Sequence, residues 1–459
     1  MTEAAPTVPT ATARASAGRR GAHAPLPFSV ILLLPAVMLL PLLIPHGAYN
    51  TAPVDGFIVL YLVFALIAWA APKRVLSFPL AAVTAFILGV SLIGVGTSQF
   101  PGPGRTTVII DLYLYVFFVA VVNDLRHDRR AVGIVLSTWA FSALAWAVLA
   151  NGITFHFLPE GLARLILSNS RALNRASATT DNPNLAASYF LISLFVLAAA
   201  PRPKSRLLRL LAALWLILAI YGTGSVAGLV GLVTGGAVMV GSFLVRRAGS
   251  TVRQAQVVIG LLLVIVAAAV LGVVNLVATR SVLNEVATIS AQQKQGGIFQ
   301  NSLGRSNRSL HGRLTLWAQG LDKSAGGARR ELLGVGAGEA KYTVDYKSLH
   351  NDILAYLVER GIIGLFGLLL LIWFVFRQSV RLLGPRGPTR LHPLGAAVFA
   401  NFAFSMTHQT LHFRHVWLLF ALVWAVTGRV RVEQEAEAPP LELEEAPRQP
   451  QPQPKPVSV

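Results

Sequence analysis

Residues 348–352 read Ser-Leu-His-Asn-Asp, and they close a long polar segment immediately before a long apolar run. His350 therefore lies where the chain changes from sequence suited to water to sequence suited to lipid. In a membrane protein this position is the water–lipid boundary, where a titrating side chain can meet an amphipathic substrate. Whether the chain spans a membrane is decided by the sequence on either side.

The composition is that of a multi-span membrane protein. Of the 459 residues, 54% are hydrophobic and only 13% are charged, whereas soluble domains average about 25% charged residues. The net charge of +19 comes mostly from Lys and Arg in short connectors between apolar runs. That distribution argues against nucleic-acid binding, which favours one basic patch. The chain has no cysteine, which excludes thiol catalysis and Cys-based metal sites.

Apolar runs long enough to cross a bilayer recur along the chain, and they predict an all-α integral membrane protein with about twelve transmembrane helices. The expected spans are 28–45, 55–71, 76–96, 106–122, 131–150, 184–200, 206–221, 225–245, 256–278, 356–376, 392–409 and 413–428.

The Lys and Arg residues of alternate connectors fix the expected orientation, because such residues favour the cytoplasmic side. This rule places both termini in the cytoplasm and a large loop between spans 9 and 10 on the opposite, periplasmic side. The expected regions are a disordered cytoplasmic tail (1–26), spans 1–9 (27–278), the periplasmic loop (279–355), spans 10–12 (356–431) and a disordered cytoplasmic tail (432–459).

Basic residues are unexpectedly frequent on the side that the positive-inside rule predicts to be poor in them. Residues 279–350 hold ten Lys and Arg, among them Arg308 and Arg313, against five Asp and Glu. The outer segment 151–183 adds three arginines, including Arg175. A single loop arginine usually contacts only solvent or lipid headgroups. A cluster of them beside His350 favours an anionic ligand, because guanidinium groups bind phosphate in bidentate fashion.

Several local patterns bear on this interpretation. Asn184 follows an Asn-Pro turn and is expected to cap the sixth span. Arg313 and Trp317 are four residues apart, on one face if the segment is helical. The glycines at 334, 336 and 338 are weak evidence for phosphate binding without a strand–turn–helix context. Asp111 is an acid inside the fourth span, open to a role as a proton relay or as a partner of a neighbouring helix.

Histidines form a second cluster near the C-terminus, at positions 408, 412 and 415. No Asp or Glu lies nearby in sequence to complete a ligand set, so we expect no metal site there. A lone histidine at an apolar boundary, such as His350, is more often a structural hydrogen-bonding group than a catalyst. The arginines of the outer loops favour the interpretation that His350 is catalytic.

These features together resemble the O-antigen ligase/O-antigen polymerase superfamily. The resemblance covers roughly residues 90–425 and rests on the number of spans, one large late outer loop, Arg313-x-x-x-Trp317, the Gly334-x-Gly336-x-Gly338 pattern and His350-Asn351 followed by Glu359-x-Gly361-x-x-Gly364. By length and loop placement the O-antigen ligases are the most similar members.

The resemblance implies a glycosyltransferase of the bacterial inner membrane with a periplasmic active site. It implies a glycan donor on undecaprenyl diphosphate, a lipid A–core sugar as acceptor, inversion at the anomeric carbon, and no metal or cofactor. By the same resemblance His350 is the base, Arg313, Arg175, Arg308 and Arg414 are candidates to hold the diphosphate, and Asn351, Trp317 and Asn184 support the site. One departure is that Val226 follows Thr223-Gly224-Ser225, where the family often has arginine.

Two alternatives remain open at this point. A polymerase of the same superfamily would use the same arginines and histidine with a second lipid-linked glycan as acceptor. A transporter of a lipid-linked anion would use the outer arginines and Asp111 without chemistry, but it favours broken or charged helices near the membrane midplane.

Overall fold

The computed structural model describes residues 26–43, 51–70, 75–98, 100–126, 128–158, 176, 180, 182–247, 313, 315–343, 349–385 and 387–437. Within these residues the regular structure is helical and contains no strand. The helices are α2 (Phe28–Met38), α3 (Pro53–Trp69), α4 (Ala81–Gly96), α5 (Pro101–Leu125), α6 (Arg129–Thr154), α8 (Pro183–Ala199), α9 (Arg206–Gly222), α10 (Val226–Arg247), α13 (Ala328–Leu333), α14 (Ala340–Thr343), α15 (Asp352–Leu383), α16 (His392–Ser405) and α17 (Arg414–Glu437).

The expected all-helical class is thus confirmed for the described residues. Eleven of the twelve apolar runs named from the sequence coincide with helices, and the run at 256–278 lies outside the described residues. Four helices, α5, α6, α10 and α15, are long and apolar enough to cross a membrane by themselves. Exposed aliphatic side chains on α9 and α10, such as Leu207 at 64% and Val233 at 60%, suit contact with lipid.

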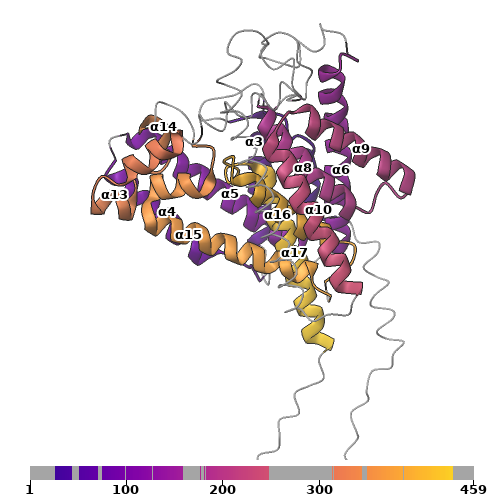
Figure 1. Cartoon of the computed structure of the whole chain (residues 1–459). Helices are drawn as coiled ribbons and strands as arrows, with labels where there is room; N and C mark the ends of the chain where they lie inside the picture. The colour runs from indigo at the N-terminus through magenta and orange to yellow at the C-terminus, as the bar shows by residue number, and fades with distance from the viewer. Residues whose placement is uncertain are drawn as a thin grey trace, which may run out of the picture.

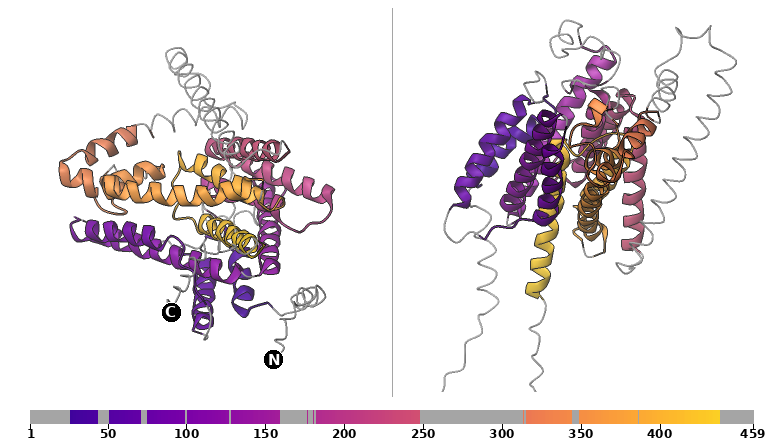
Figure 2. Two further views of the ribbon diagram at one scale, coloured as in Figure 1. Left: turned by 90° about the horizontal axis from the view of Figure 1, so that it is seen from below. Right: turned by 90° about the vertical axis from the view of Figure 1, so that its left-hand side faces the viewer.

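Helix α16 lies at the centre of the helix packing. It contacts α8, α10, α15 and α17, and α5 packs against both α17 and α4. Figures 1 and 2 show α4, α13 and α15 gathered on one side of the molecule, with α9 and α10 on the other. Large aromatic side chains fill the core between α5 and α17, where Phe118 meets Trp417 and Trp424 edge-on with ring centroids 6.0 Å apart.

The helix that follows His350 is broken near its start. Gly361 has φ +64°, which interrupts α15 after its first turns. The break frees the carbonyl groups of Val358 and Glu359 from their usual helical partners. These carbonyls accept hydrogen bonds of 2.9 Å from the backbone N–H groups of Val335 and Gly336, respectively.

The glycine pattern at 334–338 is therefore a packing device for the broken helix. A Cβ on Gly334 would lie 2.3 Å from the carbonyl carbon of Glu359, and one on Gly361 would lie 2.3 Å from that of Leu332. The two glycines allow the backbones of the loop and the helix to approach each other. This finding gives the pattern a structural reason that does not require a phosphate.

Several boundaries differ from the expected ones, and the first span is shorter than expected because α2 ends at Met38 and not at 45. Helix α15 begins at Asp352, four residues before the expected span, because Asn351 caps it. Helix α17 continues to Glu437, beyond the expected end of the membrane region at 431. The segment expected to be a loop contains helical residues 315–324 as well as α13 and α14.

Candidate active site

His350 lies at the start of α15 in an unusual backbone conformation. Its φ is +52°, in the left-handed region that side chains other than glycine rarely adopt. Such strained conformations persist only where neighbouring structure holds them, and they gather at functional sites. The residue after it, Asn351, caps α15 by accepting a 3.0 Å hydrogen bond from the N–H of Leu354.

The turn between α16 and α17, residues 406–413, packs directly on the His350 loop. The Nδ2 atom of Asn351 donates a 2.9 Å hydrogen bond to the carbonyl of Met406. The Oδ2 atom of Asp352 accepts two bonds of 2.9 Å, from the backbone N–H and the hydroxyl of Thr410. Three polar contacts thus join two segments that are remote in sequence, and they fix the position of His350.

The imidazole ring of His350 stacks on that of His408. The ring centroids are 5.1 Å apart and the planes are 11° from parallel. His408 is only 5% exposed, and Phe404 and Phe413 pack against its ring. His408 therefore covers one face of the His350 ring with a side chain that is almost entirely buried.

Arg313 and Trp317 come to the same place from the preceding segment. The indole Nε1 of Trp317 donates a 2.7 Å hydrogen bond to the carbonyl of Leu349, the residue before His350. The guanidinium of Arg313 is partly buried and close enough for its charge to act on both His350 and His408. The structure thus brings together His350, Asn351, Arg313 and Trp317, four of the residues singled out in the sequence.

The electrostatic environment keeps His350 neutral. Burial, and then the charge of Arg313, lower the pKa of His350 below its usual 6.5. The pKa of His408 falls further, to about 3, because of burial and the neighbouring His350 and Arg313. A neutral imidazole has one basic ring nitrogen, so His350 can accept a proton near pH 7.

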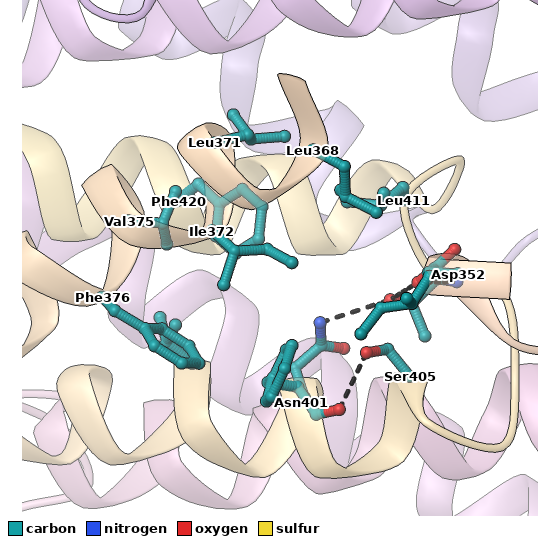
Figure 3. Close-up of a pocket in the computed structure, with 14 residues that line it drawn as sticks. Asp352, Leu368, Leu371, Ile372, Val375, Phe376, Asn401, Ser405, Leu411 and Phe420 are labelled. Carbon is teal, nitrogen blue, oxygen red and sulfur yellow. Dashed lines mark hydrogen bonds between the residues drawn. The ribbon is translucent and has the colours of Figure 1, made fainter. Parts of the chain in front are cut away.

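The polar contacts at Asp352 border a small cavity of about 30 Å³ between α15, α16 and α17. Figure 3 shows Asp352, Asn401 and Ser405 at one end of it and apolar side chains such as Val375 and Phe376 at the other. This volume is of the order of one water molecule. The cavity is therefore too small for a sugar or a diphosphate. Its lining includes Asp352 and Thr410, whose contact holds the segment that carries His350.

The intramembrane acid Asp111 is a partner of a neighbouring helix. Its Oδ2 atom accepts a 2.6 Å hydrogen bond from Nη2 of Arg360, which is 1% exposed and lies under the ring of Tyr356. Its Oδ1 atom lies 3.0 Å from Nε2 of His412. Of the two roles left open by the sequence, the partner role is the one seen, and it joins α5 to α15.

Arg414, a predicted ligand of the diphosphate, forms an ion pair with Asp55 that competes with this role. Its Nε atom donates a 2.5 Å hydrogen bond to Oδ1 of Asp55, and its Nη2 atom bonds Oδ2 of the same carboxylate. The pair is largely buried, and Tyr113 also donates to Asp55 at 2.8 Å. The charge of Arg414 is therefore balanced by a carboxylate between α3 and α17.

The expected cap at Asn184 is wrong by two residues. Asn182 caps α8, its side chain accepting a 2.9 Å hydrogen bond from the backbone N–H of Asn184, and Pro183 is the first helical residue. Proline suits that position because its missing N–H would have no helical partner. The candidate diphosphate residues Arg175 and Arg308 lie outside the described residues.

The C-terminal histidines do not face a common centre. His408 stacks on His350, His412 contacts Asp111, and His415 lies 3.0 Å through Nε2 from the hydroxyl of Ser188. Among the described residues, no group of three or more His, Asp or Glu side chains could hold a metal ion.

A second ionisable group, Glu339, lies beside the broken helix. It is 2% exposed and accepts a hydrogen bond from the hydroxyl of Ser98. Burial and then the nearby Glu359 raise the pKa of Glu339 to about 7. The effect of Glu359 on Glu339 could not be found from the sequence, because it depends on how the loop packs against the broken helix.

Sequence reasoning also missed Asp352, Thr410 and His408 as parts of the site. The one available signal for Asp352 was its place two residues after His350, at a helix start. For His408 it was membership of the histidine cluster, which was weighed only as a metal site.

Comparison with known proteins supports the sequence resemblance. No curated protein matches the chain. Residues 211–369 match the family model described as O-antigen ligase. This segment includes Arg313, Trp317, the glycine pattern, His350 and Asn351. The match confirms the resemblance to the O-antigen ligase superfamily, and residues 211–369 are the part of the chain that matches the family model.

Proposed function

We propose that this protein is a multi-pass glycosyltransferase of the bacterial inner membrane that transfers a glycan from undecaprenyl diphosphate to a sugar of lipid A–core. The reaction takes place on the periplasmic face and both termini are cytoplasmic. The observation that carries the proposal is His350, held in a strained conformation beside Arg313 within the O-antigen ligase family segment.

The proposed reaction is one displacement at the anomeric carbon. The acceptor hydroxyl loses its proton to the neutral imidazole of His350 as its oxygen attacks. The new glycosidic bond forms while the bond to the phosphate oxygen breaks, and the configuration inverts. Undecaprenyl diphosphate leaves with the bonding electrons. The environment of His350 suits this role because burial and Arg313 both favour its neutral form.

Arg313 is the proposed ligand of the leaving diphosphate. Negative charge grows on the phosphate oxygens as the bond breaks, and a fixed guanidinium stabilises that charge more in the transition state than in the ground state. Arg175 and Arg308 are further candidates from the sequence. We do not include Arg414, because Asp55 balances its charge.

The test is a transfer assay with purified full-length protein, an undecaprenyl-diphosphate glycan and lipid A–core, in the presence of a chelator. We expect wild-type transfer to the core and a loss of about 100-fold or more in His350→Ala, as removal of a general base predicts. His156→Ala is the matched control, because His156 is exposed and also has a left-handed φ, +58°. Undiminished transfer by His350→Ala would remove His350 from the mechanism.

The products separate this function from its alternatives. Glycan on lipid A–core supports the ligase, whereas longer lipid-linked glycans would show a polymerase. If no new glycosidic bond formed with either acceptor, transport of a lipid-linked glycan would become the better hypothesis. Arg313→Lys should restore only part of the donor affinity lost in Arg313→Ala, because lysine lacks the planar fork of guanidinium. Arg330→Ala, at an exposed arginine of the same segment, is the control.

A further inference from the structure

His412 stands out among the ionisable residues that the proposed mechanism does not use. It lies in the same α16–α17 turn that holds His408 and Thr410, so it belongs to the end of the helix bundle where His350 lies. Its side chain is 42% exposed, although its partner Asp111 is 11% exposed. An exposed imidazole fixed by a buried carboxylate is an arrangement that can present one ring nitrogen to a ligand.

A chain of buried hydrogen-bonded groups orients the imidazole ring of His412. Arg360 donates to Oδ2 of Asp111 at 2.6 Å and is itself held by Ser91, whose hydroxyl accepts a 2.8 Å bond from Nε. The paired Asp111 is a hydrogen-bond acceptor, so Nε2 of His412, 3.0 Å from Oδ1, is the donor. Nδ1 is then the ring nitrogen left to meet a substrate.

We propose that His412 is a second substrate-binding residue, which donates a hydrogen bond from Nδ1 of its imidazolium to a phosphate oxygen of the diphosphate donor. Asp111 and Arg360 position it. This inference rests on the proposed function, since it names the diphosphate of that donor as the ligand. His412 would also supply a positive charge two residues before Arg414, whose own charge is already balanced by Asp55.

The charges that face His412 support its protonated form. The surrounding protein takes part of the ring out of water, and this desolvation would lower the pKa of His412. The hydrogen bond and charge of Asp111 outweigh it, and the pKa is raised above 6.5. Arg360 opposes this rise and Glu359 adds to it. Asp352 is also close enough to interact with its charge. His350 and His412 thus have pKa values shifted in opposite directions, the pattern expected where one group accepts protons and another binds anions.

In the alternative, purely structural role, His412 would only hydrogen-bond to Asp111 and cover the Asp111–Arg360 pair. His412→Gln separates the two roles, because an amide can still donate to Asp111 but carries no charge. His156→Gln, at an exposed histidine away from this cluster, is the matched control. The readout is the affinity of the full-length protein in detergent for an undecaprenyl-diphosphate glycan, measured at pH 6 and pH 8 together with the thermal midpoint.

We expect wild type to bind the donor more tightly at pH 6 than at pH 8. His412→Gln should keep the wild-type thermal midpoint, bind about tenfold more weakly at pH 6, as loss of a charge-assisted hydrogen bond predicts, and lose the pH dependence. Wild-type affinity and pH dependence in a folded His412→Gln protein would overturn the inference. So would the absence of donor binding by wild type.

A second measurement needs no variant. In histidine-labelled wild-type protein, NMR titration should show the pKa of His412 rising when the donor binds, and no change in that pKa would overturn the inference. Both measurements read binding, so they are independent of transfer. If wild type binds the donor through His412 but transfers nothing, the proposed reaction fails while this binding residue stands.

Discussion

The carboxylate of Asp352 accepts two hydrogen bonds from Thr410, one from its backbone N–H and one from its hydroxyl, both 2.9 Å long. Asp352 is two residues after His350, and Thr410 lies two residues after His408 and two before His412. Together with the hydrogen bond from Asn351 to Met406, this contact sets the distance between the proposed base and the turn that supports it. It also closes the polar end of the small cavity beside α16 (Figure 3).

Asp352→Ala should lower both stability and transfer. The N–H and the hydroxyl of Thr410, which is fully buried, would lose their partner, at a cost of about 1–3 kcal/mol. His350 would lose part of its support, so transfer should fall more than donor affinity. Thermal midpoints and transfer rates in detergent measure the two effects.

The control for this prediction is Asp322→Ala, because Asp322 is exposed. Surface substitutions of this kind usually change stability by less than about 0.5 kcal/mol. If Asp352→Ala behaved like Asp322→Ala in both assays, the contact with Thr410 would have no part in holding His350.

Gly361→Ala should destabilise the protein strongly. The position has φ +64° and ψ −167°, a region adopted almost only by glycine, and it costs a residue with a Cβ roughly 1–3 kcal/mol. The added Cβ would also lie 2.3 Å from the backbone carbonyl carbon of Leu332, which has little freedom to move away. We expect a large drop in thermal midpoint and in the yield of folded protein.

Gly89→Ala provides the comparison, because this glycine lies inside α4 and nothing would meet its Cβ within 4 Å. Alanine there should be neutral or stabilising by up to about 1 kcal/mol, since glycine is the weaker helix former. Equal midpoints for the two variants would mean that the break in α15 does not depend on glycine.

Glu339→Gln should remove a pH dependence of stability. The folded-state pKa of Glu339 is about 7, above its usual 4.5, because of burial and Glu359. Between these two values the folded protein retains a proton that the unfolded chain has lost, so stability falls as pH rises from about 4.5 to about 7. Above about pH 7 the loss is complete. Thermal midpoints at pH 5.5 and pH 8 should therefore differ less in Glu339→Gln than in wild type.

The exposed Glu331→Gln variant should keep the wild-type difference between the two pH values. A Glu339→Gln protein with an undiminished difference would assign that pH dependence to other groups.

Hydropathy and the positions of Gly and Pro were enough to locate most helices, because the apolar runs needed to cross a bilayer are long and local in sequence. The motif around His350 was enough to name the proposed base. Contacts between remote segments could not be predicted from the sequence. Asp111 and Arg360 are 249 positions apart, and Asp55 and Arg414 are 359 apart. No local pattern in a single sequence specifies which acid will meet which arginine.

The glycine pattern shows the same limit in another form. From sequence, Gly334, Gly336 and Gly338 could only be weighed as a phosphate loop. In the structure they accompany the break at Gly361, where backbone N–H groups of the loop donate hydrogen bonds to carbonyl groups of α15. The need for glycine arises from a close approach between two backbones, which a linear pattern does not record.

Arg414→Ala should destabilise the protein without weakening donor binding. Removing one partner of a largely buried ion pair leaves Asp55 uncompensated, which typically costs about 3–5 kcal/mol. The double variant Asp55→Ala/Arg414→Ala should recover part of this loss, because no lone charge remains. Donor affinity, measured where each protein is folded, should stay close to wild type in both variants, whereas Arg313→Ala should weaken it. If Arg414→Ala and the double variant both bound the donor as weakly as Arg313→Ala, Arg414 would hold the diphosphate despite its pairing with Asp55, and the charge balance inferred from their contacts would be wrong.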